Sequence, residues 1–276
     1  AAKAVLAGPP PAGLLRAAPA AHKARFGRVL ALAGSEGLEG AALLTLHGLR
    51  CAGSGLIHLW APGCTRASLH GVSPEVMVAP FAEHALELAS RCDALVGGPG
   101  IGRTPEARRA LLSLLDRCPE RPWVLDADAL WHWSEAAFEL PACCLVTPHE
   151  GEALRMLGMN SDEWDGDRIA LAEAAHAASG AVVLLKGAGN VIADRDGVRV
   201  LEGGARALAR GGSGDLLAGF LAGLMGRGLS PAVAAHLGVS LQLAAATQFE
   251  GGAAEAVGQE ALAAALAAAW DVYLAD

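Results

Sequence analysis

The segment RGGSGD, at Arg210–Asp215, has the residue types and spacing of a small anion-binding site. It precedes the apolar run LLAGFLAGLMGRG, so Gly212 and Gly214 are expected at the start of a helix. A helix start offers unpaired N–H groups and a partial positive charge to an anion. Asp215 could then act as a base toward a hydroxyl held beside a phosphate. The alternative is that Ser213 or Asp215 simply caps the helix.

Carboxylates and a histidine follow two apolar runs. Asp126 and Asp128, in LDADAL, point to the same side if the chain stays extended. They could orient hydrated magnesium or ligand hydroxyls, or cap the next helix. In TPHEGE, His149 and Glu152 face the same way if Glu152 begins a helix. Taken alone, His149 is more often a hydrogen-bonded structural residue than a ligand contact. Glu152 could position magnesium through water, or simply be favourable at a helix start.

Three further motifs allow a functional or a structural interpretation. Lys186 ends the apolar run VVLL and, with Gly187 and Gly189 behind it, could hold a nucleotide phosphate or be an exposed lysine at a strand end. GGPGIG, at Gly97–Gly102, lacks the GxGxxG register of a Rossmann fingerprint. It predicts a tight turn or a close approach of backbone to a ligand. The aromatics of Trp131–Trp133 could stack on a base or nicotinamide, or pack against the sheet.

The elements that must position these residues follow from apolar runs that alternate with longer amphipathic or Ala-rich segments. This pattern predicts an α/β fold with a largely parallel sheet covered by helices. The expected strands are Arg28–Ala33, Leu56–Trp60, Ala94–Gly97, Trp123–Asp126, Cys144–Thr147, Val182–Lys186 and Asn190–Ala193. A DG turn after the last of these predicts a third strand and a late antiparallel edge, and the chain from Ser213 onward is expected to be helical. In such a sheet, loops at the carboxyl ends of the strands converge on the ligand site.

Composition narrows the class of protein. The chain has 276 residues, of which 53% are hydrophobic and 18% charged, so it is expected to be globular and to form one domain over residues 22–276. Residues 1–21 are expected to form a tail or packed N-terminal arm. The net charge of −8 argues against a nucleic-acid-binding surface. No apolar stretch is long enough to predict a membrane span, and no P-loop, HExxH or GxSxG motif is present.

The number and spacing of the cysteines indicate the redox state of the compartment in which the protein is found. Six are present, but two are adjacent and none has CxxC or Cys/His zinc spacing. Buried free thiols in a reducing cytoplasm fit this pattern better than disulfides. The first residues lack the basic start and long apolar run of a secretory signal. We therefore expect a cytoplasmic protein.

The order of these motifs is more specific than any one of them. FGRVLALAGSEGLEGAALL, GGPGIG, LDADAL, TPHEGE, LLKGAGNVIA and GGSGDLLAGFLAGL follow one another in a chain that resembles the ADP/ATP-dependent NAD(P)H-hydrate dehydratase family from Lys23 to Ala246. That family has a ribokinase-like three-layer fold, so the resemblance implies a mostly parallel central sheet flanked by helices. Other ribokinase-like enzymes, including vitamin-precursor kinases, resemble the chain more weakly.

The resemblance also implies an activity and a site. It implies a carbon–oxygen lyase that uses ADP or ATP, with Mg²⁺, to dehydrate the S form of NADH or NADPH hydrate and so repair the cofactor. Asp215 would be the base, and the amides of Gly212 and Gly214 would stabilise the transferring phosphoryl group. Hydrated nicotinamide would contact Ala41, Gly100, Gly102, His149 and Asp215. The nucleotide would contact Lys186, Gly187, Ala188, Gly189, Asn190 and Gly214, and Glu152 or Asp126 would orient magnesium through water.

Several positions depart from the family pattern around this site. Ala205 and Arg210 stand where Asn and Thr or Ser are usual, and Trp131 stands where Asn usually follows DADAL. Glu150 replaces a proline and adds negative charge beside the expected anionic ligand, and HKG becomes HKA at residues 22–24. Arg210 could supply a charged fork to the phosphate, or fill the pocket and block the substrate.

Two other functions stay open on the sequence alone. A small-molecule kinase of the same fold would yield a stable phosphorylated product, and a catalytically impaired relative would bind nucleotide without turnover. The resemblance favours a homo-oligomer and an NAD(P)H-hydrate epimerase as partner or fused domain. The Ala-rich segment Gln259–Ala269 could pack internally or form a subunit interface.

Overall fold

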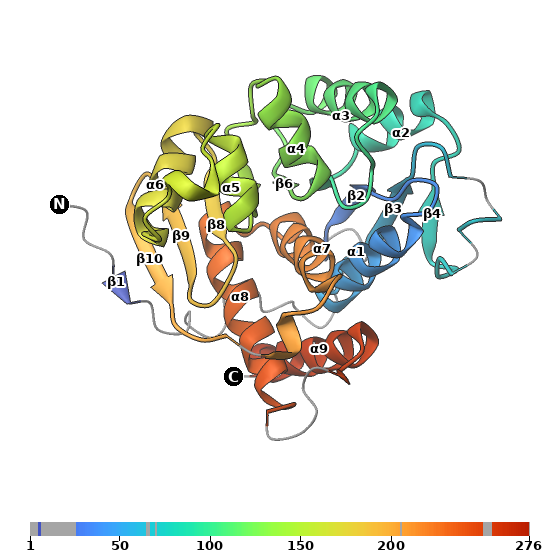
Figure 1. The fold of residues 1–276 in the computed structure, drawn as a ribbon. Coiled ribbons are helices and arrows are strands. Elements are labelled where there is room, and N and C mark those ends of the chain that lie inside the picture. The colour runs from blue at the N-terminus through green and yellow to red at the C-terminus, as the bar shows by residue number, and fades with distance from the viewer. Residues whose placement is uncertain are drawn as a thin grey trace.

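The structure is a computed structural model that describes residues 5–6, 26–64, 67–69, 71–204, 206–250 and 256–275. Within these ranges the strands form one sheet in the order β1-β10-β9-β8-β7-β6-β5-β2-β3-β4 (Figure 1). The strands are β1 (Val5–Leu6), β2 (Arg28–Leu32), β3 (Leu56–Trp60), β4 (Val76–Val78), β5 (Ala94–Gly97), β6 (Trp123–Leu125), β7 (Cys144–Val146), β8 (Val182–Leu185), β9 (Asn190–Asp194) and β10 (Gly197–Leu201).

The pairing confirms the mostly parallel sheet that the sequence predicts. Every neighbouring pair is parallel except β8 with β9 and β9 with β10, which form the expected antiparallel hairpins. The predicted strands are all present, with ends that differ by at most one residue. Two strands were not predicted: β4 is short and largely exposed, and β1 lies in the N-terminal arm, where it pairs in parallel with β10. The rest of residues 1–25, including the HKA segment, lies outside the described residues.

Helices cover both faces of the sheet, which gives three layers (Figure 1). They are α1 (Glu39–Cys51), α2 (Ala82–Ala89), α3 (Pro105–Arg117), α4 (Asp128–Glu135), α5 (Glu150–Met156), α6 (Arg168–Ser179), α7 (Ser213–Gly226), α8 (Pro231–Thr247) and α9 (Gln259–Ala275). The chain after Ser213 is helical as expected. Among the described residues, no helix combines the length and apolar character needed to cross a membrane.

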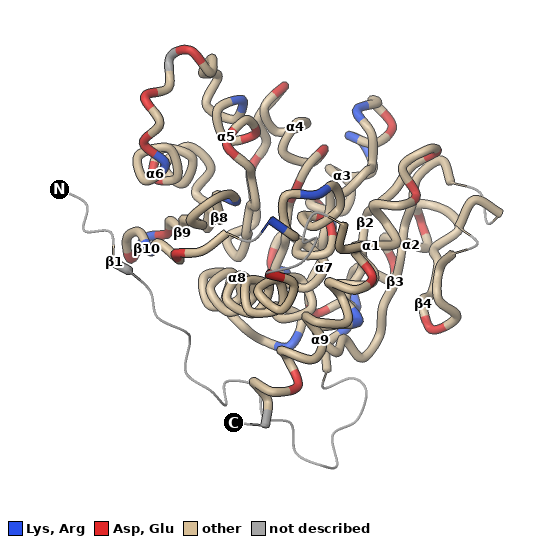
Figure 2. The backbone as a smooth tube through the Cα atoms, turned by 60° about the horizontal axis from the view of Figure 1, so that its bottom comes forward, with Lys and Arg blue, Asp and Glu red and all other residues tan. Residues whose placement is uncertain are grey.

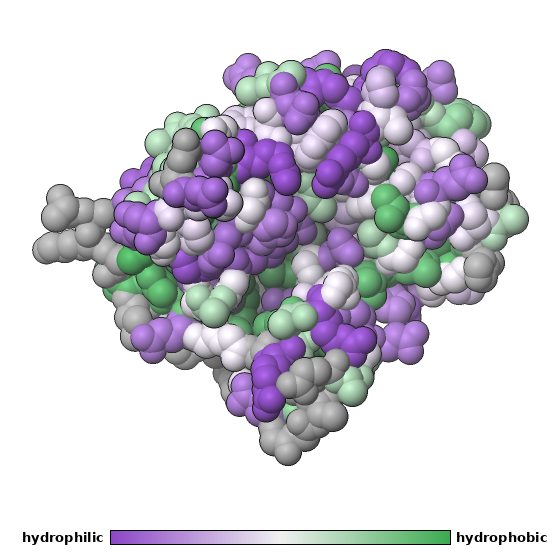
Figure 3. Space-filling view, viewed as in Figure 1, coloured by the Kyte–Doolittle hydropathy of each residue, from purple (hydrophilic) through white to green (hydrophobic). Residues whose placement is uncertain are grey.

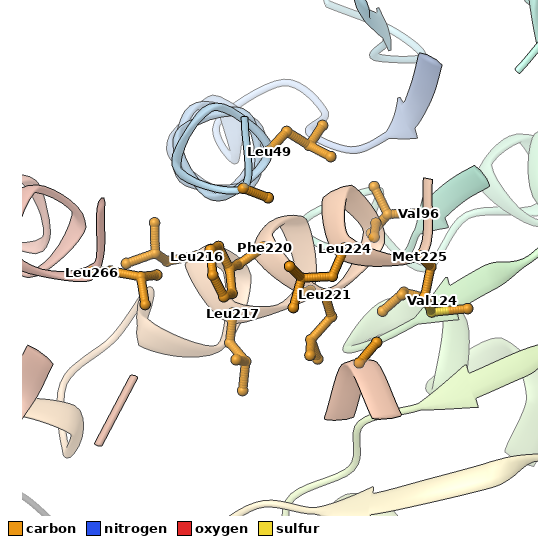
Figure 4. Close-up of a cluster of buried hydrophobic side chains, with 14 of the residues drawn as sticks. Leu49, Val96, Val124, Leu216, Leu217, Phe220, Leu221, Leu224, Met225 and Leu266 are labelled. Atoms are coloured by element: carbon orange, nitrogen blue, oxygen red, sulfur yellow. The ribbon is translucent and has the colours of Figure 1, made fainter. Parts of the chain in front are cut away.

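Alternate residues of the central strands feed two separate cores. On β2, Val29 and Ala31 belong to the core under α1, α7, α8 and α9, whereas Leu30 and Leu32 belong to the core under α2 to α6. This is why the parallel strands read as continuous apolar runs: both faces of each strand are buried. Helix α7 lies at the centre of the first core, where Phe220 packs among leucines from neighbouring elements (Figure 4).

Glycines let α7 lie unusually close to its neighbours. A Cβ at Gly219 would overlap the carbonyl oxygen of Thr45, and one at Gly48 would overlap that of Leu216. Gly223 is similarly tight against Ala52. Helix α1 therefore contacts the backbone of α7 directly, and this contact fixes where the N-terminus of α7 lies.

The C-terminal helix packs internally over one of its faces. Leu262, Leu266 and Trp270 of α9 are buried in the core shared with α1, α7 and α8, whereas Val272 is 65% exposed. The Ala-rich segment is thus part of the packed layer. All six cysteines are unpaired thiols, as expected from their spacing, but only Cys92, Cys118 and Cys144 are buried, and Cys143 is exposed.

Candidate active site

The predicted functional segments meet along the carboxyl ends of β5 to β8, where the N-terminus of α7 approaches the sheet (Figure 1). Parallel strands place their carboxyl ends along the same edge, so loops far apart in the chain become neighbours. An isolated parallel bridge between His149 and Lys186 extends the pairing of β7 and β8 beyond the strands themselves. These loops carry most of the polar side chains of the site.

The start of α7 is open rather than capped. Gly212 precedes the helix in the left-handed region, with φ of 93°, and no side chain caps the helix. Ser213 instead donates its hydroxyl to the carbonyls of Leu208 and Arg210, at 2.8 and 3.0 Å. The backbone N–H groups of Gly214 and Asp215 donate to no other residue in the described part of the chain. The capping interpretation is therefore wrong, and the anion-site interpretation keeps its geometric basis.

A buried ion pair lies directly against this helix start. The Lys186 Nζ atom is 2.7 Å from Asp126 Oδ1, and the two side chains are 19% and 2% exposed. A Cβ at Gly214 would lie 3.2 Å from Lys186 Nζ, so a larger residue would crowd the amine. Burial alone would lower the pKa of Lys186, but Asp126 and Glu152 outweigh it and raise that pKa. The interpretation of Lys186 as an exposed lysine is wrong, because its side chain is largely buried and paired with Asp126.

The two aspartates of LDADAL point to different partners. Ala127, between them, has φ of 49° and ψ of −116°, so the chain is not extended at this point. Asp126 therefore faces Lys186, whereas Asp128 faces the loop that contains Gly102. Neither aspartate caps α4 through its side chain. The expectation that both point the same way is corrected by this one turn.

His149 and Glu152 form a reciprocal cap on α5. The backbone N–H of Glu152 donates to His149 Nδ1 at 3.3 Å, and that of His149 donates to Glu152 Oε2 at 2.8 Å. The structural interpretation of both residues is thereby confirmed. His149 also lines the main cavity of the site, so it has a face toward a ligand as well. Burial and the charge of Asp126 raise the pKa of Glu152.

Asp215 lies in the first turn of α7 within the field of the same charges. Burial raises the pKa of its carboxyl to about 6, with a further rise from Asp126 and a smaller opposing effect from Lys186. Asp128 and Glu152 also raise it. A carboxyl with this pKa is half ionised near pH 6 and ionised at neutral pH, as a general base requires.

A second group of sequence-predicted residues lies between the loops after β2 and β5. Ser35 donates to the carbonyl of Gly100 at 2.8 Å, and a Cβ on Gly100 would come within 2.7 Å of the Ala41 side chain. GGPGIG is thus a tight turn, and its backbone packs closely against the loop before α1 and the first turn of that helix. Gly102 adjoins this contact and donates its N–H to Asp128 Oδ2 at 3.0 Å. Asp128 links these residues to those at the start of α7, because its charge raises the pKa of Asp215.

The main cavity, of about 610 Å³, extends from the start of α7 toward β8 and α8. In the space-filling view the same face is hollowed near its middle, with apolar residues deeper than the hydrophilic residues around them (Figure 3). Among the sequence-predicted residues, those that line it are His149, Lys186, Gly187, Ala188, Asn190 and Gly214. The lining does not include Gly189, Gly212, Glu152 or Asp215, nor Asp126, which pairs with the lining residue Lys186. Arg206, Gln242 and Leu243 also line it and were not predicted.

Arg168 organises the loop between β8 and β9 and was missed in the sequence. Its Nη2 atom lies 3.2 to 3.3 Å from the carbonyl oxygens of Leu185, Lys186 and Gly189. Its Nη1 atom pairs with Glu150. A Cβ on Gly187 would lie only 2.7 Å from the guanidinium, so glycine is needed there. The negative charge of Glu150 is therefore paired with Arg168. The expectation that Glu150 adds its charge beside an anionic ligand is not met.

The other positions at which the sequence suggested a departure also have defined places. The Arg210 side chain is exposed and is not among the cavity-lining residues, so it does not plug the cavity. Trp131 lies under the guanidinium of Arg103, 5.4 Å from the ring centre. Trp133 is buried and donates to the carbonyl of Phe138 at 3.0 Å, as the packing interpretation predicts. Ala205 lies outside the described residues.

The fold and the position of the site define a ribokinase-like α/β protein. The sheet matches that of a ribokinase-like protein from Enterococcus faecalis, with a TM-score of 0.83 and 24% identity over 93% of this chain and 91% of that one. It also matches the ADP/ATP-dependent NAD(P)H-hydrate dehydratase of Bacillus subtilis, co-crystallised with ATP and Mg²⁺, with a TM-score of 0.80 and 28% identity over 94% of each chain.

Sequence comparison is more specific, and the chain belongs to the NAD(P)H-hydrate dehydratase family, whose profile matches residues 29–267. It is 37% identical to the bifunctional NAD(P)H-hydrate repair enzyme of Moorella thermoacetica, over 87% of this chain and 48% of that protein. It is 36% identical to the ADP-dependent (S)-NAD(P)H-hydrate dehydratase of Neisseria meningitidis, over 90% of this chain and 86% of that one. The chain thus spans about half the length of the bifunctional relatives.

Proposed function

We propose that the protein dehydrates the S form of NADH or NADPH hydrate at the expense of ADP or ATP, and so acts as a carbon–oxygen lyase in cofactor repair. Family membership supports this activity. The observation that carries it is the uncapped start of α7, where Gly214 adjoins the Lys186–Asp126 pair and Asp215 has a pKa of about 6. A phosphate, a cation and a base are the parts that phosphorylation of a hydroxyl requires.

The nucleotide is assigned to the cavity between β8 and α8. Its terminal phosphate would lie at the amides of Gly214 and Asp215, with Lys186 alongside to neutralise charge. Apolar residues such as Leu217 and Leu243 line the cavity beside its polar groups, which suits an adenosine. Gly187, Ala188, Gly189 and Asn190 are assigned to the nucleotide as the loop that shapes this wall.

The hydrated nicotinamide is assigned to the neighbouring space bounded by Ala41, Gly100, Gly102 and His149. Asp215 accepts the proton of the ring hydroxyl, whose oxygen attacks the terminal phosphorus, and AMP or ADP leaves as the bridging P–O bond breaks. The phosphorylated oxygen then departs as inorganic phosphate. A neighbouring ring proton is lost, and the carbon–carbon double bond re-forms.

Magnesium fits this site only in company with the nucleotide. The described residues contain no group of three or more His, Cys, Asp or Glu side chains arranged to hold a metal ion. Asp126 is paired with Lys186, and Glu152 accepts a backbone hydrogen bond, so each is limited to contacts through water. Bound to the phosphates, the ion would supply neutralisation of their charge.

Incubation of the purified chain with S-hydrate and ADP or ATP tests the proposal. Recovery of the near-ultraviolet absorbance of reduced nicotinamide, dependent on nucleotide and accompanied by one phosphate per dinucleotide, is the expected result. A stable phosphorylated dinucleotide would identify a kinase instead. Nucleotide binding without any consumption of hydrate would identify an impaired relative, and either outcome would contradict the proposal.

The domain organisation, location and partners of the enzyme form a further part of the proposal. Residues 22–276 are assigned to one domain, which the continuous sheet supports, and residues 1–21 to an arm. The six unpaired thiols support a cytoplasmic location. Bifunctional relatives support an NAD(P)H-hydrate epimerase as partner or fused domain. A homo-oligomer is proposed from the family resemblance alone.

A further inference from the structure

We propose that Arg103 binds a phosphate group of the dinucleotide hydrate, and that Asp128 and Trp131 hold its guanidinium in position for that contact. The inference rests on the proposed function, because it adds a residue to the same substrate site. Arg103 directly follows Gly102, which is assigned to the substrate. It therefore lies beside the space assigned to the hydrate, and it is not among the residues that line the cavity assigned to the nucleotide.

One carboxylate fixes both the loop and the guanidinium. Asp128 Oδ2 accepts the backbone N–H of Gly102 at 3.0 Å, while Asp128 Oδ1 lies 3.1 Å from Arg103 Nε. The Asp128 side chain is only 14% exposed, so the carboxylate of this ion pair is held in place by the residues around it. His132 Nε2 lies 3.0 Å from the carbonyl oxygen of Gly102 and holds the other side of the same residue.

An aromatic ring restricts the guanidinium further. Its central carbon lies 5.4 Å from the centre of the Trp131 ring, within the range of a cation–π contact. Trp131 is itself packed edge-on against His132, with ring centres 5.0 Å apart. The Trp131 ring is thereby fixed as a platform for the Arg103 guanidinium.

The terminal nitrogens of Arg103 stay available to a ligand. The side chain is 56% exposed, and among the described residues only its Nε atom has a hydrogen-bonding partner. An arginine held through Nε and one ring face presents its remaining N–H groups as a preformed fork, which matches phosphate geometry. Because its position is already restricted, little side-chain entropy is lost on binding.

The negative charge of the site favours a cation at the position of Arg103. Asp126, Asp128, Glu152 and Asp215 surround the reaction centre, and the Lys186 charge is directed to Asp126. A dinucleotide hydrate brings a negatively charged pyrophosphate, and its NADPH form carries a further phosphate on a ribose. Carboxylates alone would repel these groups, whereas a fixed guanidinium attracts them.

The test compares Arg103→Gln with Arg109→Gln, in steady-state kinetics with NADH hydrate and NADPH hydrate at saturating nucleotide. Arg109 is a suitable control because it is 68% exposed on α3 and paired with Glu106. We expect Arg103→Gln to raise KM for the hydrate about tenfold, with kcat within about twofold, because one charge-assisted contact is lost. Arg109→Gln should change neither constant.

The two substrates identify which phosphate is bound. An equal rise in KM for both hydrates assigns Arg103 to the bridging pyrophosphate, and a rise for NADPH hydrate alone assigns it to the ribose phosphate. An unchanged KM for both overturns the proposal. The affinity for ADP, measured by calorimetry, should be the same in wild type and variant and so reports an intact fold.

A binding measurement separates this inference from the proposed function. If the wild-type chain consumes no hydrate, the proposed function fails, and calorimetric titration with NADPH and NADH then tests the contact alone. Arg103→Gln should bind the dinucleotide about tenfold more weakly than wild type. Equal affinities, or no binding by either protein, would refute the role of Arg103.

Discussion

Asp215 is the residue in which burial, like charge and position in the helix act together. Burial raises the pKa of its carboxyl to about 6, and Asp126 adds to the rise. A base of this strength is ionised at neutral pH and still accepts a proton more readily than an ordinary aspartate does. The residue is therefore matched to removing the proton of a hydroxyl while a phosphate is held beside it.

Replacement of Asp215 by asparagine should abolish turnover and leave ADP affinity within about threefold of wild type, because the amide cannot accept the hydroxyl proton. In the wild type, kcat/KM should rise with pH through an apparent pKa of about 6 and level off above it. Steady-state assays across pH, with calorimetric ADP titrations, provide both measurements. Residual turnover near the wild-type rate would remove Asp215 from the role of base.

The same substitution should also change stability, and the sign follows from the raised pKa. The folded protein binds the Asp215 proton more tightly than the unfolded chain, so the stability present below pH 4 is lost as pH rises through about 6. Near pH 7 the neutral asparagine avoids this loss, and the variant without ligand should gain roughly 3 kcal/mol in unfolding free energy. Denaturant unfolding at pH 4 and pH 7 should show the gain at pH 7 only.

At the scale of elements, the contact between α1 and α7 sets where the anion site lies. Gly219 and Gly48 let the two helix backbones touch, and the N-terminus of α7 is thereby held where Gly214 meets the Lys186 side chain. The glycines have no role in the chemistry itself. Their role is to place the open end of α7 beside Lys186.

Alanine at Gly219 should lower the unfolding free energy by about 3 kcal/mol, because the new Cβ would overlap the backbone of Thr45 and force the helices apart. Catalytic activity should fall as well, since the start of α7 would shift. The matched control is Gly40→Ala on α1, where no atom lies within 4 Å of the new Cβ. That variant should be unchanged or up to about 1 kcal/mol more stable in denaturant unfolding, and equal effects at the two positions would contradict the packing argument.

At the scale of the molecule, the cavity assigned to the nucleotide joins parts of the chain that lie far apart in sequence. His149 comes from the segment after β7, Lys186 from that after β8, Ser213 from α7 and Gln242 from α8. Charged residues, by contrast, are scattered over the described elements and form no extended basic face (Figure 2). A ligand in this cavity bridges several elements that would separate on unfolding.

ADP at about one hundred times its Kd should therefore stabilise the protein by about 2.7 kcal/mol, which corresponds to a rise in Tm of roughly 5 °C or more. Arg168→Gln should weaken ADP binding about tenfold and reduce the rise, because the loop carbonyls at 185, 186 and 189 lose their shared donor. Glu150→Gln is the control, since it keeps those three hydrogen bonds. Differential scanning calorimetry with and without ADP measures both variants, and an equal rise in all three proteins would show that Arg168 does not support the loop.

The sequence predicted the architecture well because apolar runs report burial directly. A strand buried on both faces, such as β5 or β8, is apolar throughout, so its position can be read within a residue. Short strands escape this argument: β4 is largely exposed, and β1 pairs only because β10 is beside it. The open start of α7 was one of two interpretations, since glycine, serine and aspartate suit a cap as well as an anion site.

The sequence by itself determined the order of strands and helices, the family resemblance and the set of candidate side chains, because these depend on local composition and spacing. Tertiary structure decided which partners those side chains have. The positive φ at Ala127 turned Asp126 toward Lys186 and Asp128 toward Gly102, and packing brought Arg168 to Glu150 and to the loop after β8. Such pairings depend on distances between segments that are remote in the chain, and only the folded arrangement of helices over the sheet fixes them.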